Sequence, residues 1–232
     1  MSVLDQKVAL ITGAKGGLGN FVTQAFLDAG ATVIGVSRSI QASDFPNPRF
    51  TAMPVQLSNR DAARQLASDI VAKFQRIDIV VHLVGGFAGG KPIHESDDET
   101  LDQMLEMNLK SALHIFQAAL PYMRKAGNGR VLAIASRAAI EASPGAGLYA
   151  ATKAALVSLV QTIAAENKDR GISANVLLPG GMDTPANRKS DPKADFSRWI
   201  QPSQVANLLV CLAADSASQV SGAAIPIYGT DL

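Results

Sequence analysis

Short apolar segments of strand length alternate along the chain with longer segments whose apolar residues show helical spacing. The expected strands cover residues 7–12, 32–37, 50–55, 77–84, 130–136, 172–178 and 223–228. The expected helices cover residues 19–30, 58–74, 100–125, 146–168 and 203–214, with Ser58 as a plausible N-cap of the second. Strands that lack a polar face and alternate with helices are typical of a parallel sheet covered on both sides. The pattern therefore predicts an α/β fold, a doubly wound parallel sheet of about seven strands in a single domain over residues 1–232.

One polar segment interrupts this alternation. Residues 183–202 read "DTPANRKSDPKADFSRWIQP", and the segment is too long for an ordinary connection. We expect it to be a functional segment, a flap over a substrate.

Composition narrows the class of protein. The chain is 47% hydrophobic and 18% charged, so it can bury a sizeable core, and its net charge of +1 provides no broad field for nucleic acid or an anionic membrane. The single cysteine fits a reducing compartment, and no apolar run approaches the ~18 residues of a membrane span. His82, His94 and His114 lack metal-ligand spacing. We therefore expect a cytoplasmic protein that binds no metal, nucleic acid or membrane.

A glycine-rich turn joins the first strand to the first helix. In "ITGAKGGLGN" the glycines Gly13, Gly17 and Gly19 have the spacing G-x-x-x-G-x-G. Glycines at such a turn let the backbone approach a pyrophosphate, which the helix N-terminus attracts. The turn predicts dinucleotide binding.

The end of the second strand bears on the choice of cofactor. An acidic residue commonly binds the adenosine ribose there, but this chain has Ser37 and Arg38. A guanidinium can pair with a 2′-phosphate, and Lys15 in the glycine turn can add positive charge. We expect NADP(H) to be favoured over NAD(H), although Arg38 can also be read as a solvated surface residue.

Tyr149 and Lys153 lie four positions apart and so share one face of a helix. A nearby ammonium favours the phenolate and makes a tyrosine usable as an acid or base. Ser136 ends the preceding strand, where ligands of doubly wound folds bind. Taken alone, the pair is equally compatible with a buried tyrosine beside a lysine whose stem is buried.

Taken together, these motifs resemble the classical short-chain dehydrogenase/reductase family over essentially the whole chain. The matching pieces are "TGAKGGLG", the asparagine of "LEMNLKS", the serine of "AIAS", "YAATK" and "PGGMDT". The resemblance implies a single-domain Rossmann fold and an NAD(P)-dependent oxidoreductase that acts on an alcohol or carbonyl group. It also implies that Tyr149 transfers the proton, Ser136 positions the substrate oxygen, Lys153 binds the nicotinamide ribose and lowers the tyrosine pKa, and Asn108 keeps a water in a proton relay.

The resemblance extends to the other contacts expected in the site. The expected cofactor contacts are Gly13, Lys15, Gly17, Leu18, Gly19, Ser37, Arg38, Gln56, Leu57, Val84, Gly85, Gly86, Tyr149, Lys153, Pro179, Gly180, Met182 and Thr184. The expected substrate contacts are Phe87, Ser136, Tyr149 and Gly181.

Two positions depart from the family pattern. The family usually has N-N-A-G after the fourth strand, whereas this chain has "HLVG" at 82–85, so the asparagine that braces the sheet is missing. The usual aspartate near the adenine is Gln56. Neither change affects the proton-transfer residues.

The substrate remains open between several interpretations. The segments 84–90 and 182–199 resemble those of dihydropteridine reductase, a member of the same superfamily, which favours a planar substrate such as a pterin or a quinone. The alternative is a 3-oxoacyl or small-ketone carbonyl reductase. A non-catalytic NADP(H) sensor is a third interpretation, but such a protein has no need for all four of the expected catalytic residues.

The expected helix that carries Tyr149 is apolar on nearly every side. Such a helix is buried on more than one side, and the sheet covers only one. We therefore expect a homodimer or a homotetramer.

Overall fold

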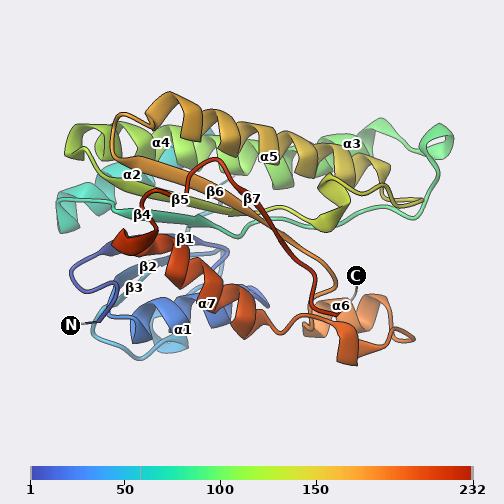
Figure 1. Cartoon of the computed structure of the whole chain (residues 1–232), viewed down its shortest axis with the longest axis horizontal. Helices are drawn as coiled ribbons and strands as arrows, with labels where there is room; N and C mark the ends of the chain where they lie inside the picture. Colours follow the sequence, from blue (N-terminus) through green and yellow to red (C-terminus); the bar gives the residue numbers. More distant parts are fainter. Residues whose placement is uncertain (1, 58, 231–232) are drawn as a thin grey trace.

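The computed structural model describes residues 2–57 and 59–230, and it contains a seven-stranded, all-parallel sheet between two layers of helices (Figure 1). The strands are β1 (Val8–Thr12), β2 (Thr32–Val36), β3 (Phe50–Met53), β4 (Ile79–His82), β5 (Gly129–Ile134), β6 (Ile172–Pro179) and β7 (Ala224–Ile227). Their order is β3-β2-β1-β4-β5-β6-β7, so the chain reverses its direction of winding between β1 and β4. Ligands of doubly wound sheets bind at the carboxyl ends of the strands that flank this reversal. The predicted single-domain Rossmann fold is confirmed.

The helices cover the two faces of the sheet. They are α1 (Gly19–Asp28), α2 (Arg60–Phe74), α3 (Asp98–Leu105), α4 (Ser111–Ala126), α5 (Gly147–Asn167), α6 (Pro185–Ser190) and α7 (Pro202–Ala213). Helices α1 and α7 lie on one face, and α2, α4 and α5 lie on the other (Figure 1).

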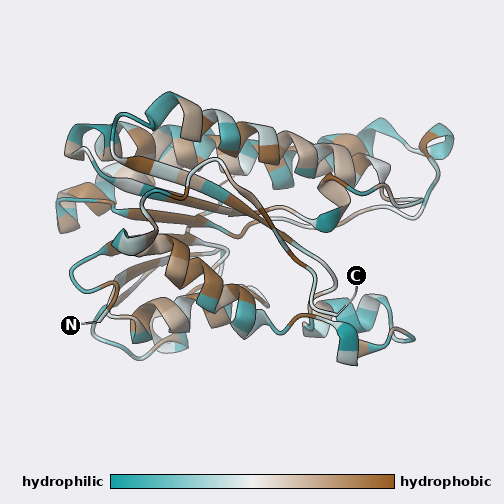
Figure 2. Cartoon of the chain, viewed as in Figure 1, coloured by the Kyte–Doolittle hydropathy of each residue, from teal (hydrophilic) through white to brown (hydrophobic). Residues whose placement is uncertain are grey.

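Alternation along each strand supplies both hydrophobic cores. In β1, Val8 and Leu10 join the core on the α2, α4 and α5 side, whereas Ala9 and Ile11 join the core on the α1 and α7 side. Figure 2 shows hydrophobic residues along the strands and hydrophilic residues around α6. Burial on both faces explains why these strands lack a polar side.

Two expected helices differ from the structure in detail. The helix expected at 100–125 is divided, because a π-helical turn, Glu106–Lys110, lies between α3 and α4. Ser58, the expected cap of α2, lies outside the described residues, and Asn59 caps that helix by accepting a hydrogen bond from the Ala62 N–H.

The polar segment 183–202 contains α6 and the short 3-10 turn Phe196–Arg198. Its two ends meet at a parallel bridge between Met182 and Ile200. The Ile200 N–H donates to the Gly181 carbonyl at 2.8 Å, and the Asp183 N–H donates to the Ile200 carbonyl at 2.9 Å. The segment therefore projects from a hydrogen-bonded base.

Helix α5 is long and apolar enough, by length and composition alone, to cross a membrane. A core helix passes the same test, and α5 packs on β6 with Leu156 and Val160 fully buried. We interpret α5 as a core helix, one side of which is left open by this chain.

Candidate active site

The glycine turn meets the loop after β4 at the reversal point of the sheet. Gly13 has a φ of +71°, and a Cβ added there would lie 3.1 Å from the Leu83 carbonyl carbon. A Cβ added to Gly19 would lie 2.0 Å from the Gly13 carbonyl oxygen. Only glycine fits these two positions, and Leu18 then leads into the N-terminus of α1. The turn fits the pyrophosphate of a dinucleotide.

The residues expected at the adenosine end are held less firmly. Arg38 follows β2 and is exposed, and no described residue forms a hydrogen bond or an ion pair with its guanidinium. Lys15 lies nearby, but its ammonium is 2.9 Å from Asp44 Oδ1 and donates to the Ser39 carbonyl at 3.2 Å. The positive charge expected from Lys15 is therefore partly neutralised by Asp44. The sequence gives no sign of this ion pair.

The other residues expected to contact the adenosine lie at the ends of β2, β3 and β4. Ser37 is half-buried at the end of β2, Gln56 is exposed beyond β3, and Leu57 is buried below it. Val84 lies in the loop after β4, next to the glycine turn, since a Cβ on Gly13 would be 3.2 Å from its N atom.

Asn108 lies in the π-helical turn and is wholly buried. Its Oδ1 accepts from the Gly86 N–H at 2.9 Å, and its Nδ2 donates to the Gly86 carbonyl and to Thr152 Oγ1, each at 3.1 Å. A Cβ added to Gly85 would lie 3.0 Å both from Asn108 Oδ1 and from Lys153 Nζ. The loop after β4 thus passes between the asparagine and the lysine.

The Ser136 hydroxyl acts on the pKa of the Tyr149 phenol. Burial raises the pKa of the Tyr149 phenol above its ordinary value of 10, and a hydrogen bond with Ser136 partly offsets this rise in the pKa. The resemblance to the family implies instead that the neighbouring lysine lowers the pKa of Tyr149. The net shift runs the other way, because desolvation outweighs the hydrogen bond and because the lysine bonds elsewhere.

Lys153 is 4% exposed, and its ammonium donates to the Ile134 carbonyl at 2.9 Å. The ammonium lies 5.9 Å from the centroid of the Tyr149 ring. Burial lowers the pKa of Lys153 to about 8. A hydrogen bond to a carbonyl at the end of β5 fixes the lysine beneath the tyrosine.

The residues that follow β6, up to Thr184, border the site at the expected nicotinamide end. Gly180 follows Pro179 and donates to the Ile227 carbonyl at 3.0 Å. Thr184 caps α6 and lies against the glycine turn, since a Cβ on Gly17 would be 3.3 Å from the Thr184 Cβ. Met182 is buried at the base of the polar segment. These contacts bring all the expected nicotinamide-end residues to the carboxyl edge of the sheet.

Gly181, an expected substrate contact, packs against an aromatic residue of the polar segment. A Cβ on Gly181 would lie 2.7 Å from Trp199 Cδ1, and Trp199 in turn stacks against Phe196 with 4.8 Å between ring centroids. This aromatic pair is therefore structural at the base of the segment.

An apolar rim borders Tyr149. The ring of Phe87 meets the Tyr149 ring edge-on, with 5.1 Å between centroids. Phe87 and Ile93 are 63% and 65% exposed. Phe87 follows β4, and Ile93, in the 3-10 turn Ile93–Glu95, lies against the start of α5, since a Cβ on Gly147 would collide with its Cδ1. Exposed apolar side chains grouped at a site are typical of a binding surface.

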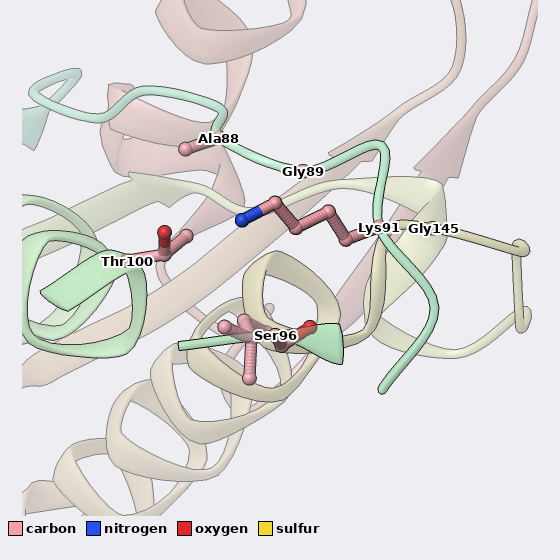
Figure 3. Close-up of a pocket in the computed structure, with 7 residues that line it drawn as sticks. Ala88, Gly89, Lys91, Ser96, Thr100 and Gly145 are labelled. Atoms are coloured by element: carbon pink, nitrogen blue, oxygen red, sulfur yellow. The ribbon is translucent and has the colours of Figure 1, made fainter. Parts of the chain in front are cut away.

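A small cavity of about 110 Å³ lies beside this rim (Figure 3). It is lined by Ala88, Gly89, Lys91, Ser96, Thr100, Gly145 and Leu148. Figure 3 shows the Lys91 side chain extending along the cavity from the loop after β4. The Lys91 ammonium also pairs with Asp97 at 3.1 Å, so the cavity carries little uncompensated charge.

Several residues that hold the site together were not among the predicted site residues. Thr152 and Trp199 contact expected site residues directly, and His82, read only as a non-ligand, lies buried at the end of β4. Thr152 lies within "YAATK", next to Lys153, so that motif offers a signal for it. Within the described residues, no group of three or more His, Cys, Asp or Glu side chains gathers as metal ligands do.

Known proteins match this chain along most of its length. A 3-oxoacyl-acyl-carrier-protein reductase of Thermotoga maritima is 32% identical, over 97% of this chain and 98% of the relative. A 2-dehydro-3-deoxy-D-gluconate 5-dehydrogenase of Pseudoalteromonas atlantica is 30% identical, over 97% and 96%.

Solved structures agree in fold. A short-chain type dehydrogenase/reductase from Mycobacterium ulcerans has a TM-score of 0.92 at 25% identity, covering 100% of this chain and 91% of its own. ElxO with NADP bound has a TM-score of 0.91 at 24% identity, covering 100% and 99%. The model of the short chain dehydrogenase family matches residues 7–195. The chain therefore belongs to the short-chain dehydrogenase family, a family of nicotinamide-dependent oxidoreductases.

Proposed function

We propose that this protein is an NADP(H)-dependent carbonyl reductase in which Tyr149 is the general acid. The observation that carries the proposal is the convergence of Ser136, Tyr149 and Lys153 beside the glycine turn, with Asn108 behind them. A protein that only sensed the cofactor would gain nothing from a phenol, a serine and a buried lysine placed together at this position.

The cofactor would be held by three parts of the chain. The glycine turn and the α1 N-terminus would bind the pyrophosphate, the loop 84–86 would lie along the dinucleotide, and Pro179 to Thr184 would border the nicotinamide. Bound there, the reduced nicotinamide supplies the hydride that the reaction needs.

The chain itself supplies the proton. Ser136 would hold the substrate oxygen next to the Tyr149 hydroxyl, which donates its proton as negative charge develops on that oxygen. The raised pKa of Tyr149 keeps the phenol protonated at neutral pH, as a proton donor must be. Lys153, fixed by the Ile134 carbonyl, places positive charge beneath the phenol and stabilises the phenolate that remains.

Several features support NADPH as the preferred cofactor. Ser37 and Arg38 follow β2, and the unpaired, exposed guanidinium can reach an adenosine 2′-phosphate. The structural neighbour ElxO binds NADP. Because Asp44 shares the Lys15 ammonium, we assign the preference to Arg38 first and to Lys15 second.

The substrate that the site best supports is an apolar ketone or a 3-oxoacyl thioester. The Thermotoga maritima relative is a 3-oxoacyl reductase by name, and the apolar rim suits an acyl chain.

A planar pterin-like or quinone substrate is the second candidate. The exposed Phe87 ring beside Tyr149 favours it, because a flat ring can stack there. On either reading, we propose that the segment 183–202 is the flap over the nicotinamide end, since its base directly follows the expected cofactor contacts.

We also propose a homo-oligomer. Helix α5 leaves a side of small residues uncovered by this chain, including Ala151, Ala154 and Ser158, and a second copy would cover them. Sedimentation equilibrium at micromolar concentration tests this, and a monomer would contradict it.

One screen tests the function. NADPH consumption is measured with acetoacetyl-CoA, small ketones, a quinone and a quinonoid dihydropterin. We expect the oxoacyl thioester or the ketones to be reduced fastest, with Phe87→Ala raising KM more than it lowers kcat. Fastest turnover of the dihydropterin or quinone would select the second candidate, and no turnover of any compound would contradict the reductase proposal.

A further inference from the structure

The imidazole of His82 is wholly buried at the end of β4, next to the catalytic machinery but outside it. Its Nδ1 lies 2.9 Å from Thr12 Oγ1 at the end of β1, and its Nε2 lies 3.2 Å from Ser111 Oγ at the start of α4. The ring also meets Phe116 edge-on, with 5.8 Å between centroids. Both ring nitrogens have protein partners, so the imidazole has no atom left for a substrate.

The neighbouring hydrogen bonds show which groups donate and which accept along the series Thr12, His82 and Ser111. The Ser111 hydroxyl donates to the Met107 carbonyl at 2.6 Å, so its oxygen accepts from the His82 Nε2–H. On the other side, Thr12 Oγ1 accepts from the Leu83 N–H at 3.3 Å and donates to Nδ1. The network thus assigns a neutral imidazole with its proton on Nε2.

This chain of donors ends in the π-helical turn that carries Asn108. The Ser111 N–H, which would bond to Met107 in an α-helix, bonds to the Glu106 carbonyl instead. The Ser111 hydroxyl takes its place at the Met107 carbonyl. The Ser111 side chain, which His82 holds, therefore completes the π-helical turn. It does so at the Met107 carbonyl, and Asn108 directly follows Met107.

The charge around His82 favours the same arrangement. Burial, with the Lys153 ammonium as the second cause, lowers the pKa of His82 to about 3. The imidazole is therefore neutral at every pH at which the protein is expected to work, as the hydrogen bonds to Thr12 and Ser111 require.

We propose that His82 is a positioning residue that acts through Ser111 to fix the π-helical turn, and thereby sets Asn108 against Gly86 and beside Lys153. The inference rests on the proposed function, because its kinetic consequence requires a reductase. Among the described residues no hydrogen bond joins Asn108 to His82, so the effect passes through Ser111 and the backbone of Met107.

The main test is Ser111→Ala, with Ser173→Ala as its matched control. Ser173 is a buried serine on β6 whose hydroxyl has no partner among the described residues. With acetoacetyl-CoA and NADPH, we expect Ser111→Ala to lower kcat on the order of 10- to 100-fold, because a misplaced relay group slows the reaction strongly. The Kd for NADPH should stay within about twofold, and the solvent deuterium isotope effect on kcat should rise, which a purely structural role would not cause.

A second pair of variants tests the imidazole itself. His82→Leu removes both hydrogen bonds, whereas His82→Gln retains a donor and an acceptor. We expect His82→Gln to recover part of the kcat lost in His82→Leu. If His82→Leu does not fold, Ser111→Ala and His82→Gln still decide the question.

Amide hydrogen exchange supplies a measurement that needs no turnover. The Gly86 N–H bonds to Asn108 Oδ1, so loosening of the π-helical turn should speed its exchange at least about tenfold in Ser111→Ala and not in Ser173→Ala. Unchanged exchange and kcat in Ser111→Ala, or equal changes in the Ser173→Ala control, would overturn the inference. A wild-type protein that reduces no carbonyl compound would sink the reductase proposal instead, and the exchange rates would still decide whether His82 positions Asn108.

Discussion

The proposed catalytic half and the proposed adenosine half of the site are built in opposite ways. In the catalytic half, Asn108 and Lys153 are almost completely buried, and backbone carbonyls or side chains partner their polar atoms. In the adenosine half, Arg38 is exposed, and the Lys15–Asp44 pair has side-chain exposures of 37% and 22%. Burial and hydrogen bonds fix the side chains of the catalytic half, whereas the adenosine half consists of a few exposed charged side chains.

The difference has an energetic consequence. Removing a buried hydrogen-bonded group leaves partners unsatisfied and costs about 1–3 kcal/mol or more, whereas an exposed ion pair contributes about 0–1 kcal/mol. Substitutions in the catalytic half should therefore change chemistry or stability strongly. Substitutions in the adenosine half should change the cofactor preference gradually and leave the chemistry intact.

The largest effect is expected from Tyr149→Phe. The change removes the phenolic oxygen that pairs with Ser136 and keeps the ring against Phe87. Loss of a general acid should lower turnover by roughly 10²–10⁴. NADPH binding, followed by fluorescence titration, should remain within about twofold, because the ring still fills its place.

The matched control is Tyr122→Phe on α4, which packs against the core without touching the site. It should retain near-normal turnover. Normal turnover in Tyr149→Phe would remove the assigned proton donor and with it the contrast between the two halves.

The next effect concerns stability and pH. The folded protein holds the pKa of His82 at about 3, whereas an unfolded chain protonates it near its ordinary 6.5. Below pH 6.5 the unfolded state therefore binds the additional proton, and folding stability falls as the pH falls. From pH 6.5 to 5 the loss should be at most about 2 kcal/mol.

Urea unfolding at pH 7.5 and pH 5 measures this loss. His82→Gln is the matched variant, because glutamine does not titrate and should lose less stability over the same range. An equal loss in both proteins would show that His82 does not carry the effect.

These expectations rest on parts of the molecule that differ in how far the sequence predicts them. Strands such as Val8–Thr12 are predicted well, because burial on both faces leaves a continuous apolar run. Helical spacing and the end of a strand single out Tyr149, Lys153 and Ser136, and the resemblance to the family implies their roles. These are local patterns that packing preserves.

The missed features depend on contacts between distant segments. Nothing in "LEMNLKS" marks a π-helical turn, because the turn is completed by a histidine from β4 through Ser111. Asp44 lies far along the chain from Lys15, and no motif joins them. The direction of the Tyr149 pKa shift depends on burial by the whole site, which a spacing of four residues does not report.

In the exposed half, Arg38→Ala should weaken NADPH binding about tenfold and leave NADH binding unchanged, because one charge-assisted contact to the 2′-phosphate is lost. Arg60→Ala, an exposed arginine at the start of α2, is the control and should change neither cofactor's Kd. Equal loss of affinity for both cofactors would show that Arg38 does not read the 2′-phosphate.

The smallest effect is expected from Asp44→Asn, which tests whether the adenosine half is restrained by its own acid. The Asp44 carboxylate pairs with Lys15 and accepts from the Gln41 N–H at 2.8 Å, and an asparagine oxygen can keep the second contact while losing the charge. The Lys15 ammonium would then be free for a 2′-phosphate. Because an exposed pair is weak, NADPH should bind only up to about fivefold more tightly, with NADH unchanged and the gain reduced at high salt. Asp69→Asn, on the exposed side of α2, changes the net charge equally and should leave both Kd values unchanged. If both variants shift NADPH binding equally, net charge alone accounts for the effect, and if neither does, the Lys15–Asp44 pair has no part in cofactor choice.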